Sequence, residues 1–352
     1  MTKKFNFPPG PYGLPVIANL PAILSSNPTE YFTKCSHKFG DIYNLRFGQR
    51  RVCILSSTDL VREVFNSKNA QDRVTNVAYY KVFGKNAHGV AFSSKDPWKD
   101  SRRFILGLFR DLGVGRGVFE SKVTSEAELV KKLAEGINRK EVDLKQKFFW
   151  AVGNITCGIV FGKQYDYNDP TLKQFINFVD VFPKVSGPGA LVLTSPFLCA
   201  LPFGPGYKAA VIHETLRISN VAPLGIPHVT DKDIKLSGFD IPKGTTIAAN
   251  MTAILMNDKI FKNPDKVNPD RFIKNGVFEE SSHVIPFSTG TRVCIGEKLA
   301  RMELLIFLAH LLFRYSFKPP KDVTMPRILD GVEYAVARCP MPYSVVKSER
   351  YA

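Results

Sequence analysis

The chain of 352 residues has no run of eighteen apolar residues, so the sequence predicts no segment that crosses a bilayer. It opens Met-Thr-Lys-Lys-Phe-Asn, without the apolar core of a secretory leader, and we expect no signal peptide. There is no CxxC or HxxxH pair, which argues against a structural zinc site with four protein ligands. The six cysteines have no framework spacing, which is typical of free thiols in a reducing compartment.

Acidic residues are scarce relative to basic ones. The chain has 32 Asp and Glu against 48 Lys and Arg, a formal net charge of +16. One interpretation is nucleic-acid binding, but no basic run alternates with aromatic residues as a base-stacking surface requires. The other is attraction to an anionic membrane surface or to an acidic redox partner. We favour the second interpretation and expect no nucleic-acid partner.

One segment near the C-terminus is the most informative part of the chain. Residues 287–296 read F-x-x-G-x-R-x-C-x-G and continue directly into an amphipathic stretch, residues 297–313, that predicts a helix. A cysteine binds metal as a thiolate, which positive charge stabilises, and Cys294 stands where a loop enters a helix with unpaired N–H groups. Arg292 could hold an anionic group with paired hydrogen bonds. A single thiolate beside such an arginine suits haem better than zinc.

The other fixed positions of this segment have steric roles. Gly290 and Gly296 permit turns and close backbone approach that a side chain would block. Phe287 could shield the sulfur from water. The alternative is a buried structural cysteine beside two loop glycines, which would leave Arg292 and the glycine spacing unexplained.

This segment resembles the cysteine-ligand loop of the cytochrome P450 family, the haem-thiolate monooxygenases. The resemblance implies haem b as cofactor, with Cys294 as the axial iron ligand whose electron donation favours O–O cleavage. It also implies NADPH–cytochrome P450 reductase as electron donor and a small apolar substrate that receives one oxygen atom from O2. The expected location is the cytoplasmic face of the endoplasmic reticulum membrane, which this chain would contact peripherally, without an anchor of its own.

Further segments resemble parts of the family that bind the haem propionates. Asp96-Pro-Trp98-Lys-Asp-Ser-Arg102 resembles the W-x-x-x-R helix, and Trp98 and Arg102 at i and i+4 can reach one anion. Pro227-His228 resembles the segment whose histidine meets a propionate. Arg73, in Gln71-Asp-Arg-Val, is a looser match to another propionate arginine. Apart from the resemblance, His228 would be an ordinary hydrogen-bonded histidine and Arg73 a surface arginine.

Two more segments resemble the structural core of the family. His213-Glu214-Thr-Leu-Arg217 carries the E-x-x-R pair, whose members at i and i+3 share one helix face. Asn268-Pro-Asp-Arg271-Phe resembles the segment whose arginine joins that pair, so we expect Glu214, Arg217 and Arg271 to form a fully paired network. Taken alone, the i, i+3 pair would be interpreted as an exposed surface pair.

The resemblance extends from Pro8 to about Tyr343 and points to the animal drug- and steroid-metabolising branch, with family 2-like features. Phe7-Pro-Pro-Gly-Pro11 resembles the proline-rich hinge that follows the membrane anchor of microsomal members. The distal-helix pattern A/G-G-x-D/E-T-T/S has no match, and the one Thr-Thr pair, Thr245-Thr246, belongs to a turn before a strand. No catalytic acid–threonine pair is therefore assigned.

The order of the motifs indicates an internal deletion. A segment ending at Tyr207, which resembles the loop after the sixth helix, joins the E-x-x-R helix directly near residues 207–209. We therefore expect residues 1–352 to be one incomplete cytochrome P450 domain, in which helices G to J, including the distal I helix, and the N-terminal anchor are absent. We expect haem binding and poor oxygen transfer. The alternative function is a non-catalytic truncated isoform or gene-model fragment that at most binds haem.

The predicted fold class is mainly α with a small β-sheet. Hydrophobic periodicity and capping residues predict helices, and alternating β-branched runs predict strands. The predicted helices cover residues 28–40, 58–65, 96–111, 120–137, 145–161, 171–182, 248–256 and 297–313. Strands are predicted at residues 42–47 and 52–55, within 226–247, and after residue 315.

Overall fold

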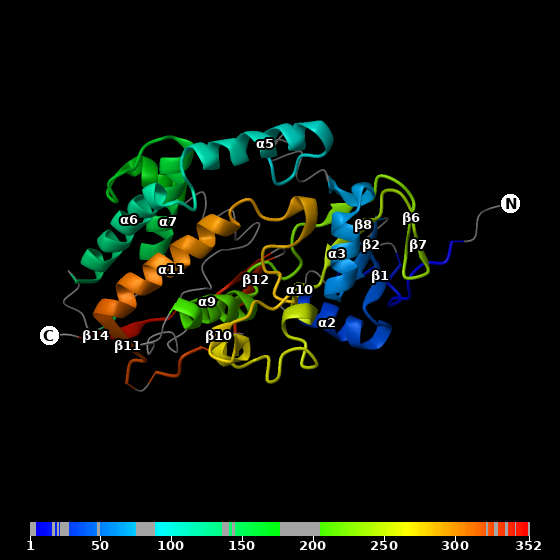
Figure 1. Cartoon of the computed structure of the whole chain (residues 1–352). Helices are drawn as coiled ribbons and strands as arrows, with labels where there is room; N and C mark the ends of the chain where they lie inside the picture. The colour runs from blue at the N-terminus through cyan, green and yellow to red at the C-terminus, as the bar shows by residue number, and fades with distance from the viewer. Residues whose placement is uncertain are drawn as a thin grey trace.

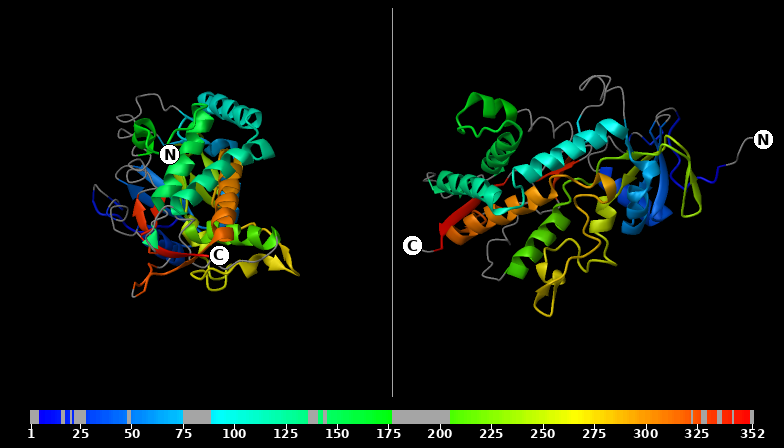
Figure 2. Two further views of the ribbon diagram at one scale, coloured as in Figure 1. Left: turned by 90° about the vertical axis from the view of Figure 1, so that its left-hand side faces the viewer. Right: turned by 45° about the horizontal axis from the view of Figure 1, so that its top comes forward.

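The computed structural model places a group of helices at one end of the molecule and the largest sheet at the other, as Figures 1 and 2 show from three sides. No helix in the part of the chain that the structure describes is long and apolar enough to cross a membrane. The described residues are 5–15, 18–19, 21, 28–47, 50–74, 89–135, 141–142, 145–176, 205–321, 323–326, 330–334, 337–341 and 343–350.

The N-terminal part folds as predicted. A helix is followed by an antiparallel hairpin and a second helix: α2 (Pro28–Phe39), β1 (Ile42–Phe47), β2 (Arg50–Leu55) and α3 (Thr58–Asn66). Ser57 caps α3, since its side chain accepts a hydrogen bond from the N–H of Leu60. Beyond α3 lie η1 (Lys68–Ala70) and β3 (Asp72–Arg73), which are not among the elements predicted from the sequence. Both are too short to show a hydrophobic period.

The main sheet joins strands that are far apart in sequence. Its order is β1-β2-β8-β5-β3, with β8 (Thr246–Ala249) parallel to β2 and β5 (His228–Val229) antiparallel to both β8 and β3. In the last pairing, Arg73 stands directly opposite His228. The sheet thus brings together two of the predicted propionate-binding residues.

The remaining strands form smaller sheets, and those within residues 141–142 and 273–278 were not predicted as strands. Two-stranded sheets pair β6 (Ile234–Leu236) with β7 (Phe239–Ile241), β9 (Ile273–Lys274) with β10 (Val277–Phe278), and β12 (Val332–Tyr334) with β13 (Ala337–Cys339). A three-stranded sheet has the order β11 (Tyr315–Lys318), β14 (Val345–Glu349) and β4 (Glu141–Val142).

The helical end is built from α6 (Gly117–Glu135), α7 (Lys145–Val160) and α11 (Glu297–Arg314), with α5 (Lys95–Asp111) across the top of Figure 1. These helices were predicted to within a few residues, α6 beginning three residues before the predicted start. Burial of large apolar side chains drives their packing. One cluster links α6, α7 and α11 through Phe119, Val123, Phe148, Ile155, Phe307 and Leu311.

The helix that carries the E-x-x-R pair packs beside α11. This helix is α9 (Pro205–Ser219), and Ile212 and Leu216 form a buried cluster with Leu304 of α11. Asn250 caps the short helix α10 (Met251–Leu255), since its side chain accepts a hydrogen bond from the N–H of Ala253. The short 3-10 helix η4 (Pro269–Phe272) follows further along the chain. The predicted helix at 171–182 is helical as far as residue 176, and its remainder lies outside the described residues.

Glu303 on α11 is a buried carboxyl group, and its Oε1 has no hydrogen-bond partner among the described residues. Burial raises its pKa from 4.5 to about 8, because the apolar surroundings disfavour the charged form. Between pH 4.5 and about 8, the folded protein therefore keeps Glu303 protonated, whereas the unfolded chain has released this proton. The free energy of unfolding falls as the pH rises through this range. We expect Glu303→Gln to raise the melting temperature at pH 8 and to have little effect at pH 4.

Thermal unfolding at the two pH values measures this difference. The exposed Glu120 of α6 offers a matched control, since Glu120→Gln removes the same charge from a solvated site. A melting temperature that Glu303→Gln changes equally at both pH values would contradict the prediction.

Candidate functional site

The cysteine loop lies between Phe287 and the start of α11. Its centre is η5 (Gly290–Arg292), and the N–H of Cys294 donates to the carbonyl oxygen of Phe287 at 3.0 Å. Gly290 has a φ of 79°, and a Cβ at this position would lie 2.2 Å from the carbonyl oxygen of Phe65. Only glycine fits here, because a side chain would collide with the backbone of another segment.

Gly296 and Phe287 differ from the sequence-based expectation. Gly296 has an ordinary φ of −81°, and a Cβ there would make only van der Waals contact with Cys294 Sγ, at 3.8 Å. The backbone therefore does not require glycine at this position, although its small size keeps space open beside the sulfur. The Phe287 ring packs against the cluster between α9 and α11, while Cys294 remains exposed.

The Cys294 thiol lies at the start of α11 in a mixed electrostatic environment. Although the residue is exposed, the protein excludes water from one side of the sulfur, and this desolvation raises the pKa of the thiol. The backbone N–H groups of Gly296 and Glu297 and the Arg102 guanidinium act in the opposite direction. The expected stabilisation of the thiolate by N–H groups at the helix start is therefore present, but desolvation and the charge of Glu297 outweigh it.

Arg292 is buried and held by backbone carbonyl groups. Its Nε and Nη2 donate to the carbonyl oxygen of Gln71 at 3.0 and 2.6 Å, and Nη2 also donates to that of Ser93 at 2.9 Å. The guanidinium lies 3.8 Å from the centre of the Trp98 ring, a cation–π contact. The remaining nitrogen, Nη1, is buried and has no partner among the described residues. Arg292 thus offers an anion one nitrogen, and not the paired hydrogen bonds we expected.

Arg73 and His228 are both buried within the sheet, which corrects the alternative of a surface arginine. Arg73 donates from Nε to the carbonyl oxygen of Ala91 at 3.1 Å and from Nη1 to that of Ile226 at 2.6 Å. Nδ1 of His228 lies 2.6 Å from the carbonyl oxygen of Ala70, so this nitrogen carries the proton. The His228 ring also stacks on Phe65, with ring centres 3.8 Å apart. Nε2 of His228 has no hydrogen bond to any of the described residues.

Together, these residues form what we call the arginine cluster. Arg102 joins it from α5, where its Nη1 donates to the carbonyl oxygen of Val293, next to the cysteine. Burial, aided by Arg292, lowers the pKa of Arg73 to about 9, and burial lowers that of Arg292 to about 10. Burial and the charge of Arg73 lower the pKa of His228 to about 3, so this histidine is neutral at physiological pH. The cluster consists of Arg73, Trp98, Arg102, His228 and Arg292.

Sequence reasoning missed the groups that hold these arginines in place. They are main-chain carbonyl oxygens of Gln71, Ala91, Ser93 and Ile226, together with the ring of Phe65. Every residue has a carbonyl group, so no sequence pattern distinguishes the ones that accept these hydrogen bonds. The Gln71 position could have been suspected only from its place beside Arg73.

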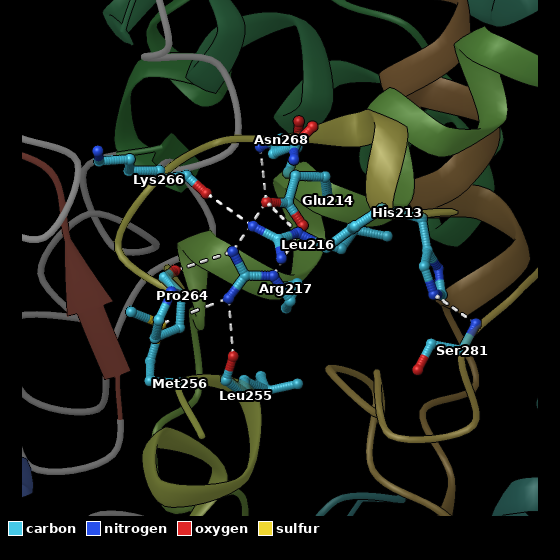
Figure 3. A network of polar contacts seen from close by, with 12 residues as sticks. His213, Glu214, Leu216, Arg217, Leu255, Met256, Pro264, Lys266, Asn268 and Ser281 are labelled. Carbon is cyan, nitrogen blue, oxygen red and sulfur yellow. Dashed lines mark hydrogen bonds and ion pairs between the residues drawn. The ribbon is translucent and has the colours of Figure 1, made fainter. Parts of the chain in front are cut away.

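Glu214, Arg217 and Arg271 form an ionic network, and Figure 3 shows Glu214 and Arg217 with their hydrogen-bond partners. Arg217 donates to both carboxylate oxygens of Glu214, at 2.7 and 2.8 Å, and Arg271 donates to Oε1 at 3.1 Å. The N–H of Asn268 donates to the same oxygen, and Arg217 also reaches the carbonyl oxygens of Leu255 and Pro264. Both members of the E-x-x-R pair are completely buried, and neither is a surface residue.

The chain resembles known proteins over most of its length. A family model described as Cytochrome P450 matches residues 8–203 and 206–346. Cytochrome P450 2K1 of Oncorhynchus mykiss is 27% identical over 441 residues, covering 90% of this chain and 86% of the relative. Cytochrome P450 2D14 of Bos taurus is 27% identical over 465 residues, with 96% and 92% covered. Cytochrome P450 2J2 of Homo sapiens is 24% identical, with 90% and 87% covered.

The match covers most of the chain and includes the cysteine loop, the arginine cluster and the buried network. The relatives named above all belong to family 2 of these proteins. The chain therefore belongs to the cytochrome P450 family of haem b-dependent monooxygenases and resembles its family 2 members.

Proposed function

We propose that this chain binds haem b with the Cys294 thiolate as axial iron ligand and with the haem propionates at the arginine cluster. When bound, haem supplies the activation of O2 and the transfer of one oxygen atom to a substrate. Cys294 is exposed, so its sulfur is open to a ligand.

The observation that carries this proposal is Nη1 of Arg292, which is buried and has no partner among the described residues. A buried charged donor that lacks an acceptor is costly, and a carboxylate is the acceptor that a guanidinium prefers. Asp72 acts electrostatically on Arg292, and no other carboxylate among the described residues is a cause of the pKa shifts of Arg73, Arg102 or Arg292. A ligand with two carboxylate groups, such as haem b, supplies the missing negative charge.

The protein groups around the cysteine have separate tasks. Backbone N–H groups of Gly296 and Glu297 stabilise negative charge on the sulfur, as does Arg102. Arg102 also ties the loop to α5 through the Val293 carbonyl oxygen. Trp98 lies against the Arg292 guanidinium and so fixes the direction of its free nitrogen.

By family resemblance, the reaction inserts one O2-derived oxygen atom into a small apolar substrate. Electrons come from NADPH through NADPH–cytochrome P450 reductase, and the site of action is the cytoplasmic face of the endoplasmic reticulum membrane. The positive net charge of +16 suits both an acidic partner and an anionic membrane surface. Since the sequence contains no acid–threonine pair of the distal type, no residue of this chain is assigned to proton delivery.

A second candidate function is a non-catalytic truncated isoform or gene-model fragment that at most binds haem. The family match is interrupted between residues 203 and 206, close to the junction expected near residues 207–209. The alignment with the Oncorhynchus mykiss relative extends over 441 positions, and this chain has 352 residues, so at least 89 aligned positions have no counterpart here. This supports one incomplete cytochrome P450 domain that lacks helices G to J.

Titration of the purified chain with hemin, followed by the absorption spectrum of the ferrous–CO complex, tests haem binding. We expect a Soret band of the thiolate-ligated type. Added reductase and NADPH then separate the two candidates. We expect NADPH consumption to exceed product formation, because the sequence contains no acid–threonine pair of the distal type to deliver protons. Product formed in step with NADPH would contradict the truncated-isoform candidate, and absence of haem binding would contradict the proposal itself.

A further inference from the structure

Gln71 lies between η1 and β3 and contacts the end of α3. Its side-chain Nε2 donates to the carbonyl oxygens of Phe65 at 2.9 Å and Ser67 at 2.5 Å. Both acceptors belong to the last turn of α3 and its cap, where helix carbonyl groups lack internal partners. The Gln71 amide therefore supplies hydrogen bonds to carbonyl groups at the C-terminal end of α3.

The same residue also reaches the cysteine loop. Its Oε1 accepts a hydrogen bond from the Thr291 hydroxyl, and its main-chain oxygen accepts two from Arg292. The neighbouring Gly290 touches the Phe65 carbonyl group, one of the two acceptors of the Gln71 amide. Gln71 is thus the point at which α3, β3 and the cysteine loop meet.

A primary amide suits this place because it donates and accepts through different atoms. A carboxylate could accept from Thr291 but could not donate to two carbonyl oxygens, and an aliphatic side chain could do neither. Groups that surround a metal ligand set its orientation, and their loss typically weakens metal affinity. Cys294 lies only three residues beyond Thr291, with its N–H held by Phe287.

We propose that Gln71 is a positioning residue that sets the place of the cysteine loop relative to the sheet that carries Arg73 and His228. The inference rests on the proposed role of Cys294 as iron ligand. Through Arg292, Gln71 also determines which guanidinium nitrogen remains free for an anion. The contacts of Gln71 with Thr291 and Arg292 then set the distance between the Cys294 sulfur and the arginine cluster.

Amide hydrogen exchange over residues 290–296 tests the positioning without haem. In Gln71→Leu, a near-isosteric change that removes all three side-chain hydrogen bonds, we expect faster exchange at the Cys294 N–H. We expect haem affinity to fall by roughly 10-fold to 100-fold, and a larger share of the ferrous–CO complex to lose the thiolate-type spectrum. In Gln71→Glu, which keeps the acceptor for Thr291, we expect an intermediate effect.

Two comparisons separate positioning from general stability. Gln164→Leu removes an amide that donates to Glu126 in the α6–α7 region, and should change neither the exchange of the loop nor the spectrum. Gln71→Leu and Thr291→Val should be non-additive, because both remove the same hydrogen bond.

Unchanged loop exchange and unchanged haem affinity in Gln71→Leu would overturn this inference and leave the role of Cys294 intact. If the wild-type chain takes up no haem, the proposed function fails instead, and hydrogen exchange still decides whether Gln71 positions the loop.

Discussion

Cys294→Ser is expected to abolish the thiolate-type Soret band of the ferrous–CO complex. A serine hydroxyl does not ionise at neutral pH and is a poor replacement for a thiolate, whereas the backbone hydrogen bond from residue 294 to Phe287 remains possible. We expect the spectrum to change completely and haem affinity to fall by at least about 10-fold, since the iron loses its protein ligand. Hemin titration with the CO difference spectrum measures both effects.

The loss must be separated from misfolding. Cys294 is exposed, so the melting temperature of the haem-free variant should match that of the haem-free wild type. Cys35→Ala provides a matched control, because Cys35 is buried in a different cluster beside Phe32. It should leave the spectrum unchanged, and a thiolate-type band that survives in Cys294→Ser would refute the assignment.

Glu214→Gln is expected to lower the free energy of unfolding by about 3–5 kcal/mol, the typical cost of removing one partner from a buried ion pair. Arg217 is completely buried and would keep its charge while losing the carboxylate that binds it through two hydrogen bonds. Glutamine keeps a single acceptor oxygen, so its NH2 group must face either Nε of Arg217 or the donors of Arg271 and Asn268 that now bind Oε1. Chemical denaturation of the haem-free chain measures the change.

Glu30→Gln is the matched control, because Glu30 pairs with Lys34 on α2 at 2.6 Å with both side chains largely exposed. Exposed pairs contribute little, so this variant should be nearly as stable as the wild type. Equal stability of Glu214→Gln and wild type would show that the network is dispensable for the fold.

Several parts of the molecule could be predicted because their signals are local. Ser57 caps α3 and Gly40 follows α2, so the ends of these helices are marked by the residues beside them. The i, i+3 spacing in the E-x-x-R segment places Glu214 and Arg217 on one helix face before any packing is known. The cysteine loop was identified for the same reason, since its residues are contiguous and each has a distinct chemical or steric use.

Long-range contacts were beyond such reasoning. The opposition of Arg73 and His228 depends on how β3 pairs with β5, and the two-residue strands carry no pattern that specifies a partner. The single free nitrogen of Arg292 depends on which carbonyl oxygens of Gln71 and Ser93 come within reach.

The pKa of Cys294 also depends on long-range contacts that the sequence does not specify. Backbone N–H groups and Arg102 lower the pKa of the thiol, yet desolvation, together with the charge of Glu297, outweighs them and raises it. The sequence specifies which side chains can bind a cofactor or form ion pairs, because residue types and their local spacings follow directly from it. Burial, partner choice and the balance between desolvation and charge arise from the packing of distant segments, and these quantities set the geometry and charge of the site.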